Sequence, residues 1–223
     1  MPLILATAQH EDAVRIAEIH MAAFGSNAML LAQFPTTAVR QAMKQCVRLK
    51  ALADIDDPNI TVLVVRDSGL AKRAGDIQDC SFSTTAKVIA FAKWAHPLST
   101  NEEYTEAPWI WPEGTNLKVV EEWTKKTEEA HARAVGDSPC YHLSFIGTDP
   151  SYERLGAATM MIQWGIGQCK KYHVPAYLES TLEAAPFYRK LGFEEVENFS
   201  LGCEIADSGI IKTYEEISFI YNI

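Results

Sequence analysis

The chain has 223 residues, of which 48% are hydrophobic and 22% charged, and its formal net charge at pH 7 is −9. These values are typical of an ordinary globular protein with a real core, and no apolar run reaches the roughly 20 residues that span a bilayer. The acidic balance argues against nucleic-acid binding, which normally needs a basic footprint. It would favour a cationic ligand such as an amine, although an effect on solubility alone is the more ordinary explanation.

The five cysteines are widely spaced and odd in number, and they include no C-x-x-C pair. This pattern argues against both a disulfide framework and a zinc site. The residues from Met1 to Ala8 carry no charged region before their apolar residues, so no signal peptide is evident. We therefore expect one cytoplasmic domain over residues 1–223, with no metal and with neither a nucleic acid nor a membrane as partner.

The first half of the chain alternates between strand-like and helical patterns. In chain order we predict a strand at residues 3–7, helices at 11–24 and 37–53, and strands at 60–66 and 87–94. Ala13, Ile16, Ala17 and His20 share one face of the first helix at helical spacing. Residues 67–85 are polar and contain glycines, so we expect a loop that joins the two strands as an antiparallel pair.

Residues 97–137 form an extended middle segment. It begins irregularly, with three prolines and the cluster Trp109-Ile110-Trp111, and continues into a helix at 117–134. The remaining elements are a strand at 141–148, a helix at 155–172, a strand at 176–180, a helix at 182–191 and strands at 193–196 and 214–221. This order predicts the α/β (α+β) class, with a mixed central sheet flanked by helices.

The stretch from Ser144 to Ala158 joins an apolar strand to a helix that begins on small residues. Small residues let a ligand's phosphates approach the backbone, and the N–H groups of a first helical turn lack helical partners. These groups and the positive end of the helix dipole can bind an anion, and Arg154 adds a positive charge. The same pattern also occurs where a helix merely packs closely on a sheet, so it does not identify a site by itself.

The hexapeptide Glu153-Arg154-Leu155-Gly156-Ala157-Ala158 resembles the Q/R-x-x-G-x-G/A signature of the GNAT acetyltransferases. Further along, the sequence from Ala184 to Phe193 is similar to the second motif of that family, a helix that ends in Tyr-x-x-Leu-Gly-Phe. The resemblance covers roughly residues 141–196. The middle segment, with Trp109 and Trp111, resembles a fungal branch of small-molecule GNAT enzymes.

The resemblance implies the GNAT fold, in which the parallel strands at residues 141–148 and 176–180 are splayed and acetyl-CoA lies in the gap as co-substrate. The pantetheine arm would pair with the backbone of the first strand near its end, at Phe145, Ile146, Gly147 and Thr148. The pyrophosphate would rest on the backbone N–H groups of Arg154, Leu155, Gly156, Ala157, Ala158 and Thr159.

In the family, a tyrosine at the position of Tyr188 contacts the thioester sulfur and can protonate the leaving thiolate, which a phenol of pKa ~10 is able to do. The alternative is that Tyr188 only packs against Phe187 and Phe193. For the base we consider Glu179 and His142, a water relay, or an amine that arrives deprotonated. By strand alternation Tyr177 and Glu179 share one face, as do His142, Ser144 and Ile146.

Two residues depart from the family pattern, because Glu153 replaces Gln or Arg and Thr181 replaces a common Asn. Both substitutions put contacts to the cofactor in doubt. Five aromatic residues could wall the acceptor pocket or belong to the core: Phe24, Phe34, Trp94, Trp109 and Trp111.

The function we expect is direct transfer of an acetyl group from acetyl-CoA to an amine of a small molecule or peptide. The alternatives are a non-catalytic acyl-CoA-binding module on the same fold, and a structural α/β protein that shares only the fold. The sequence leaves the acceptor unnamed and leaves a homodimer open.

Overall fold

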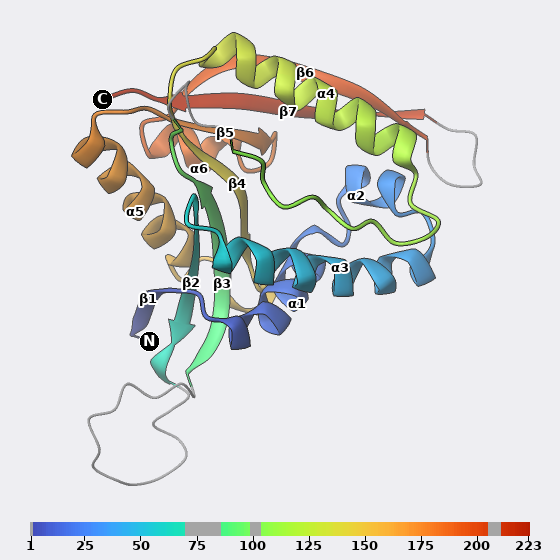
Figure 1. The fold of residues 1–223 in the computed structure, drawn as a ribbon, viewed down its shortest axis with the longest axis horizontal. Coiled ribbons are helices and arrows are strands. Elements are labelled where there is room, and N and C mark those ends of the chain that lie inside the picture. The colour runs from blue at the N-terminus through green and yellow to red at the C-terminus, as the bar shows by residue number, and fades with distance from the viewer. Residues whose placement is uncertain (1, 70–85, 99–103, 205–210) are drawn as a thin grey trace, which may run out of the picture.

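The computed structural model describes residues 2–69, 86–98, 104–204 and 211–223 (Figure 1). The helices are α1 (Ala13–Phe24), α2 (Ala28–Gln33), α3 (Thr37–Asp56), α4 (Leu117–Ala134), α5 (Ala157–Tyr172) and α6 (Ala185–Lys190), with short 3-10 turns η1 (His10–Asp12) and η3 (Pro150–Tyr152). The strands are β1 (Leu3–Thr7), β2 (Ile60–Asp67), β3 (Lys87–Ala95), β4 (Tyr141–Thr148), β5 (Ala176–Thr181), β6 (Glu194–Glu204) and β7 (Ile211–Tyr221).

The strands form a seven-stranded sheet in the order β1-β2-β3-β4-β5-β7-β6. The pair β4–β5 is parallel, and each of the other neighbouring pairs is antiparallel. The predicted mixed sheet flanked by helices is therefore confirmed. The parallel pair needs a crossover connection, which α5 provides between the two strands.

Helices cover both faces of the sheet (Figure 1). On one face, α1 and α3 pack on β2 and β3 through a buried cluster that includes Ile16, Ile19 and Val64. On the opposite face, α5 packs on β3, β4 and β5 through the largest cluster, which includes Met161 and Ile162. In Figure 1, α4 runs along β6 and β7, and a segment at residues 104–116 crosses between α3 and α4.

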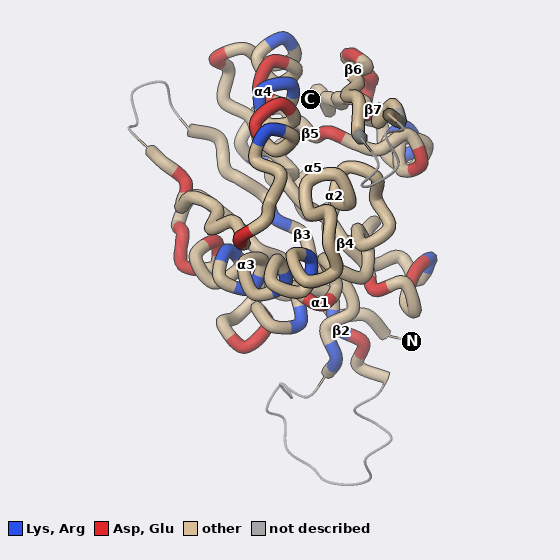
Figure 2. Tube along the Cα trace, turned by 90° about the vertical axis from the view of Figure 1, so that its right-hand side faces the viewer, with Lys and Arg blue, Asp and Glu red and all other residues tan. Residues whose placement is uncertain are grey.

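Charged residues of both signs follow one another along α4, which carries blue and red bands in Figure 2. Lys125 and Arg133 both pair with Glu129 at a spacing of four residues, and Arg133 also forms a bidentate contact with Glu197 on β6. These pairs are exposed and are worth little individually. No helix among the described residues is long and apolar enough to cross a membrane.

The predicted bounds hold closely for most elements. The strand at residues 3–7 and the helix at 117–134 match β1 and α4 residue for residue, and residues 60–66 and 87–94 do form an antiparallel pair, β2 and β3. The buried positions of α1 include the four residues expected from spacing. The helix α2 was not predicted, β6 and β7 extend beyond the expected strands, and most of the expected loop at 67–85 lies outside the described residues.

Candidate active site

The parallel strands β4 and β5 separate after three residue pairs. Tyr141 pairs with Ala176, His142 with Tyr177 and Leu143 with Leu178. Beyond this point β4 continues to pair with β3, and β5 continues to pair with β7. Each strand therefore turns an unpaired backbone edge toward the gap, and these N–H and C=O groups are available to a ligand. The predicted splay is present at the end of β4 that carries Phe145 to Thr148.

A β-bulge sits where the two strands begin to separate. On β3, the consecutive residues Lys93 and Trp94 pair with Phe145 and Leu143, so Ser144 is an extra residue on β4. The bulge reverses the alternation of side chains. Phe145 consequently packs toward α1, while Ile146 packs against the α5 cluster. The expectation that His142, Ser144 and Ile146 share one face is wrong for Ile146, because alternation fails across the inserted residue.

The loop between β4 and α5 is fixed by Asp149. The backbone N–H of Ser151 donates to Asp149 Oδ1 at 2.9 Å, and Arg15 from α1 forms an ion pair with the other carboxylate oxygen. Arg15 also donates to the carbonyl oxygen of Val88 at 3.0 Å. The hydrogen bonds from Ser151 and Arg15 hold the pKa of Asp149 below its usual value despite partial burial, which opposes them. Arg15 thus ties α1 and β3 to the loop that precedes α5.

The N-terminus of α5 is open to solvent. Gly156 caps the helix with φ of 92°, and a Cβ added there would meet no atom within 4 Å. The first helical hydrogen bond runs from the N–H of Met160 to the carbonyl of Gly156 at 3.1 Å, so the N–H groups of residues 157–159 lie outside the helical ladder. Arg154 also has positive φ, 60°, which for a non-glycine residue often marks a functional site. Glu153 and Arg154 are both exposed.

The two candidate bases contact each other. His142 Nε2 lies 3.0 Å from Glu179 Oε2, a pairing across the parallel strands. Tyr177 lies on the same side, with its ring centroid 5.3 Å from that of His142, which agrees with the predicted shared face of Tyr177 and Glu179. The hydroxyl of Tyr177 is fully buried near Glu179 and Ser218, but it makes no hydrogen bond of regular geometry among the described residues. Such an orphaned group indicates a place for a water molecule or a polar ligand atom.

A third histidine, His131 on α4, packs against Tyr177 and His142. Its ring stacks edge-on against Tyr177 with centroids 4.7 Å apart, lies 5.6 Å from His142, and its Nε2 is 3.5 Å from Cys140 Sγ. Burial lowers the pKa of His131, so its imidazole is neutral at pH 7 and able to accept a proton. The sequence analysis did not select His131, because no recognised motif in α4 includes it.

A buried carboxylate, Glu216 on β7, lies further along the same side of the sheet. It accepts hydrogen bonds from Tyr214 at 2.7 Å and from the Trp123 indole at 3.2 Å. Burial is the main cause of its raised pKa, and the neighbouring Glu179 adds to the shift. The side of the gap that faces α4 is therefore acidic. Glu216 is separated from the recognised motifs, so no local signal in the sequence marks it.

Tyr188 lies in α6 among aromatic rings. Its ring centroid is 5.2 Å from Phe187, 5.9 Å from Phe193 and 5.8 Å from Phe219, and its side chain is buried. Burial raises its pKa. The packing interpretation is thus part of the structure, while the catalytic role remains a prediction. Thr181 Oγ1 accepts from the N–H of Ala184 at 3.4 Å, so this side chain is engaged in the turn before α6.

The five aromatic residues proposed for the acceptor pocket separate into two groups. Trp94 is fully buried on the α5 face and packs with Trp164, so it belongs to the core. The other four gather on the α1 side: Trp109 stacks on Trp111 at 5.0 Å, Trp111 lies 5.9 Å from Phe34, and Phe24 packs in the same cluster. Trp109 also meets Phe145 edge-on at 6.0 Å, which places this group next to the gap.

Comparison with known proteins agrees with this geometry. Residues 97–193 match the model of the acetyltransferase (GNAT) family. The match covers somewhat less than half of the chain and includes the loop and helix that follow β4, β5 and α6. A relative named "Probable acyltransferase SID5" from Ajellomyces capsulatus is 40% identical over 62 residues, which are 28% of this chain and 43% of that protein. The chain thus matches less than half the length of that relative.

Solved structures share the fold over the whole chain. A histone acetyltransferase HPA2 and related acetyltransferase from Corynebacterium glutamicum is 17% identical with a TM-score of 0.60, covering 100% of this chain and 97% of that one. The polyamine N-acetyltransferase of Drosophila melanogaster is 11% identical with a TM-score of 0.60, covering 100% of both chains. At these identities the likeness establishes the GNAT fold alone.

Proposed function

We propose that this protein transfers an acetyl group from acetyl-CoA to an amine of a small molecule by direct transfer. The observation that carries the proposal is the opening of β4 from β5 after Leu143, directly beside the paired side chains of His142 and Glu179. A thioester arm in that gap would bring its acyl group to a carboxylate and an imidazole. The family match and the fold of the Drosophila polyamine N-acetyltransferase support the same reaction class.

The residues present fit acetyl-CoA. The unpaired edge of β4 from Phe145 to Thr148 offers backbone groups to the pantetheine amides. The stretch from Arg154 to Thr159, which is exposed at residues 154–156, offers helix N–H groups and a guanidinium to the pyrophosphate. No atom lies within 4 Å of a Cβ built at Gly156, so a phosphate has room to approach the backbone there.

The acceptor needs a base because its protonated ammonium has no lone pair for attack. Glu179 and His142 are the groups we propose for this task, joined by their 3.0 Å contact. The neutral imidazole of His131 and the orphaned hydroxyl of Tyr177 lie against them. A water molecule held between these groups would extend the path by which the proton leaves.

Acetyl-CoA supplies an activated acyl group, and its thiolate must be protonated when it leaves. We propose Tyr188 as the donor. The raised pKa of Tyr188 keeps its hydroxyl protonated at neutral pH, which an acid requires.

The test is release of free thiol from acetyl-CoA in the presence of a panel of amines, together with calorimetric measurement of acetyl-CoA binding. We expect binding and amine-dependent thiol release. Binding without thiol release for any amine would replace the enzyme with the alternative, a non-catalytic acyl-CoA-binding module. Absence of binding would remove the proposal altogether.

A further inference from the structure

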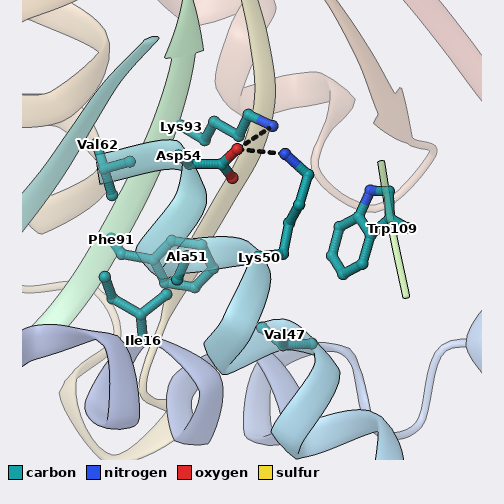
Figure 3. Close-up of a pocket in the computed structure, with 9 residues that line it drawn as sticks. All are labelled: Ile16, Val47, Lys50, Ala51, Asp54, Val62, Phe91, Lys93 and Trp109. Carbon is teal, nitrogen blue, oxygen red and sulfur yellow. Dashed lines mark hydrogen bonds and ion pairs between the residues drawn. The ribbon is translucent and has the colours of Figure 1, made fainter. Parts of the chain in front are cut away.

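Four charged side chains form a cluster of ion pairs near the gap between β4 and β5, and Figure 3 draws three of them, Lys50, Asp54 and Lys93. Lys50 and Asp54 come from α3, Lys93 comes from β3, and Glu106 comes from the irregular segment at 104–116. The first three are at most 5% exposed. Burial of charges is costly, and apolar residues would hold these elements together equally well. The cluster therefore calls for an explanation other than stability.

Both lysines are directed at the same two carboxylates. Lys93 Nζ lies 3.1 Å from Asp54 Oδ1 and 2.5 Å from Glu106 Oε1. Lys50 Nζ lies 2.6 Å from the same oxygen of Glu106 and also pairs with Asp54. Asp54 is one helical turn from Lys50 and is a fixed partner. Without Glu106, two buried ammonium groups would share one carboxylate and carry a net positive charge.

Glu106 differs from the other three members. Its side chain is 37% exposed, and it belongs to a segment without helix or strand hydrogen bonding in the described residues. Hydrogen bonds from Lys50 and Lys93 hold its pKa below the usual value, against the effect of burial, so it is a carboxylate. Its oxygen occupies a place where two ammonium groups converge. Another carboxylate could take the same place with the same partners.

The cluster lies one strand from the proposed reaction site. Lys93 is the register partner of Phe145 on β4, at the start of the gap. On the same side, Lys50 Nζ is 6.0 Å from the centroid of Trp109, and Trp109 is 6.0 Å from Phe145. Figure 3 shows Lys50, Lys93 and Asp54 pointing toward one another beside Trp109, next to a cavity of about 20 Å³. An extended acceptor could reach from the cluster along Trp109 to the gap.

We propose that Lys50 and Lys93 form a carboxylate-binding site for the acceptor, and that Glu106 occupies this site in the acceptor-free protein. The acceptor is then an amine that carries a carboxylate several bonds away. The inference rests on the proposed acetyl transfer and adds the chemical class of the acceptor. Binding of the substrate carboxylate displaces Glu106 and leaves the charge of the cluster unchanged.

The test compares amines with and without a carboxylate. The pairs are β-alanine with ethylamine, γ-aminobutyrate with propylamine, and ε-aminocaproate with pentylamine. Charge-assisted hydrogen bonds contribute enough to change affinity roughly 10- to 100-fold. We expect kcat/KM for at least one acid to exceed that of its plain amine by this factor. Equal values in each pair would overturn the proposal.

Three variants assign the effect to the cluster. Lys93→Met should abolish the preference for the acid over its plain amine, because it removes one of the two ammonium groups that would bind the carboxylate. Lys44→Met removes an exposed lysine of α3 that pairs with Glu18 at 3.2 Å, and it should keep the preference. Glu106→Gln removes the competing carboxylate and should lower KM for the acid alone. If Glu106→Gln instead lowers the activity toward acid and amine alike, Glu106 is only a structural contact and the proposal fails.

A binding measurement separates this proposal from the proposed function. Calorimetry of ε-aminocaproate and pentylamine with the Glu106→Gln protein needs no turnover. Tighter binding of the acid, lost on adding Lys93→Met, supports the site even if no thiol is released and the acetyl transfer fails. Equal binding of both probes overturns the site even if acetyl transfer to plain amines is observed. If Lys93→Met alone unfolds the protein, the Glu106→Gln result still decides.

Discussion

The two mid-helix glycines of α5 give a prediction whose magnitude follows from the structure. Gly165 faces the sheet, and a Cβ added there would lie 2.5 Å from Trp94 Cη2 and 2.7 Å from Trp94 Cε2, closer than real Cβ atoms approach other atoms. Trp94 is fully buried between β2, β4 and α5 and has no free direction to move. Gly167 lies two residues further on the exposed side, where an added Cβ would meet nothing within 4 Å.

Alanine at either position gains helix propensity, worth roughly 0.5–1 kcal/mol relative to glycine. At Gly165 the overpacking cost of roughly 1–3 kcal/mol opposes this gain. The gain is common to both variants, so the difference between them isolates the contact with Trp94. For a protein of this size a difference of about 2 kcal/mol corresponds to roughly 4–8 °C in Tm.

The assay is thermal denaturation of the Gly165→Ala and Gly167→Ala proteins, followed by circular dichroism. We expect Gly167→Ala to melt above the wild type and Gly165→Ala to melt well below Gly167→Ala. Equal melting temperatures for the two variants would refute the reasoning, because the close packing of α5 on Trp94 would then not depend on the absence of a Cβ at residue 165. The consequence for function is that this close packing fixes where the N-terminus of α5 lies.

The remaining predictions concern the site and its environment. Tyr188→Phe should lower kcat by roughly 10²–10⁴-fold with little change in the Kd of acetyl-CoA, and near-normal turnover of a slow amine would exclude Tyr188 as the acid. Ala158→Glu should weaken acetyl-CoA binding at least about fivefold in calorimetry, because the new carboxylate would repel the pyrophosphate. Unchanged affinity would mean that the pyrophosphate binds elsewhere. Ala158 is chosen because a side chain at Gly156, where φ is positive, would also strain the backbone. Chelators should leave turnover unchanged, and a loss restored by a divalent metal would contradict this. Burial lowers the pKa of His20 from 6.5 to about 4, so between these pH values His20 is protonated in the unfolded chain but not in the folded protein. The free energy of unfolding should therefore fall by roughly 3 kcal/mol from pH 6.5 to pH 4. An equally steep loss in a folded His20→Gln variant would refute that origin.

The parts of the structure that the sequence could predict are those set by neighbouring residues. The periodicity of apolar residues placed β1, α4 and β4 with their exact bounds. The order of strand, small residues and helix located the start of α5 at Gly156, while anion binding there stays a prediction. Capping, turn chemistry and burial patterns act over a few residues, so one sequence contains them.

Other features depend on pairs that are distant in the chain. The bulge at Ser144 exists only in the register between β3 and β4, and without it Ile146 was assigned to the wrong face. The short helix α2 has six residues, too few for a periodic pattern, and is held by Asn27 accepting from the N–H groups of Met29 and Leu30. His131 joins His142 only because α4 folds back over the sheet. No local signal marks these contacts.

The net charge of the sequence does not show how charge is distributed around the gap between β4 and β5. The net charge of −9 favours a cationic ligand, and Glu179 and Glu216 do stand on the α4 side of the gap. On the α3 side, however, Lys50 and Lys93 converge on a carboxylate. An acceptor with an amine at one end and a carboxylate at the other matches both sides at once. The two sides would also orient it, because reversing such a molecule places its ammonium group against two lysines and its carboxylate against two glutamates. A plain diamine, which the net charge alone would favour, has no partner for its second charge at the lysine cluster, and this difference is what the comparison of acids with plain amines measures.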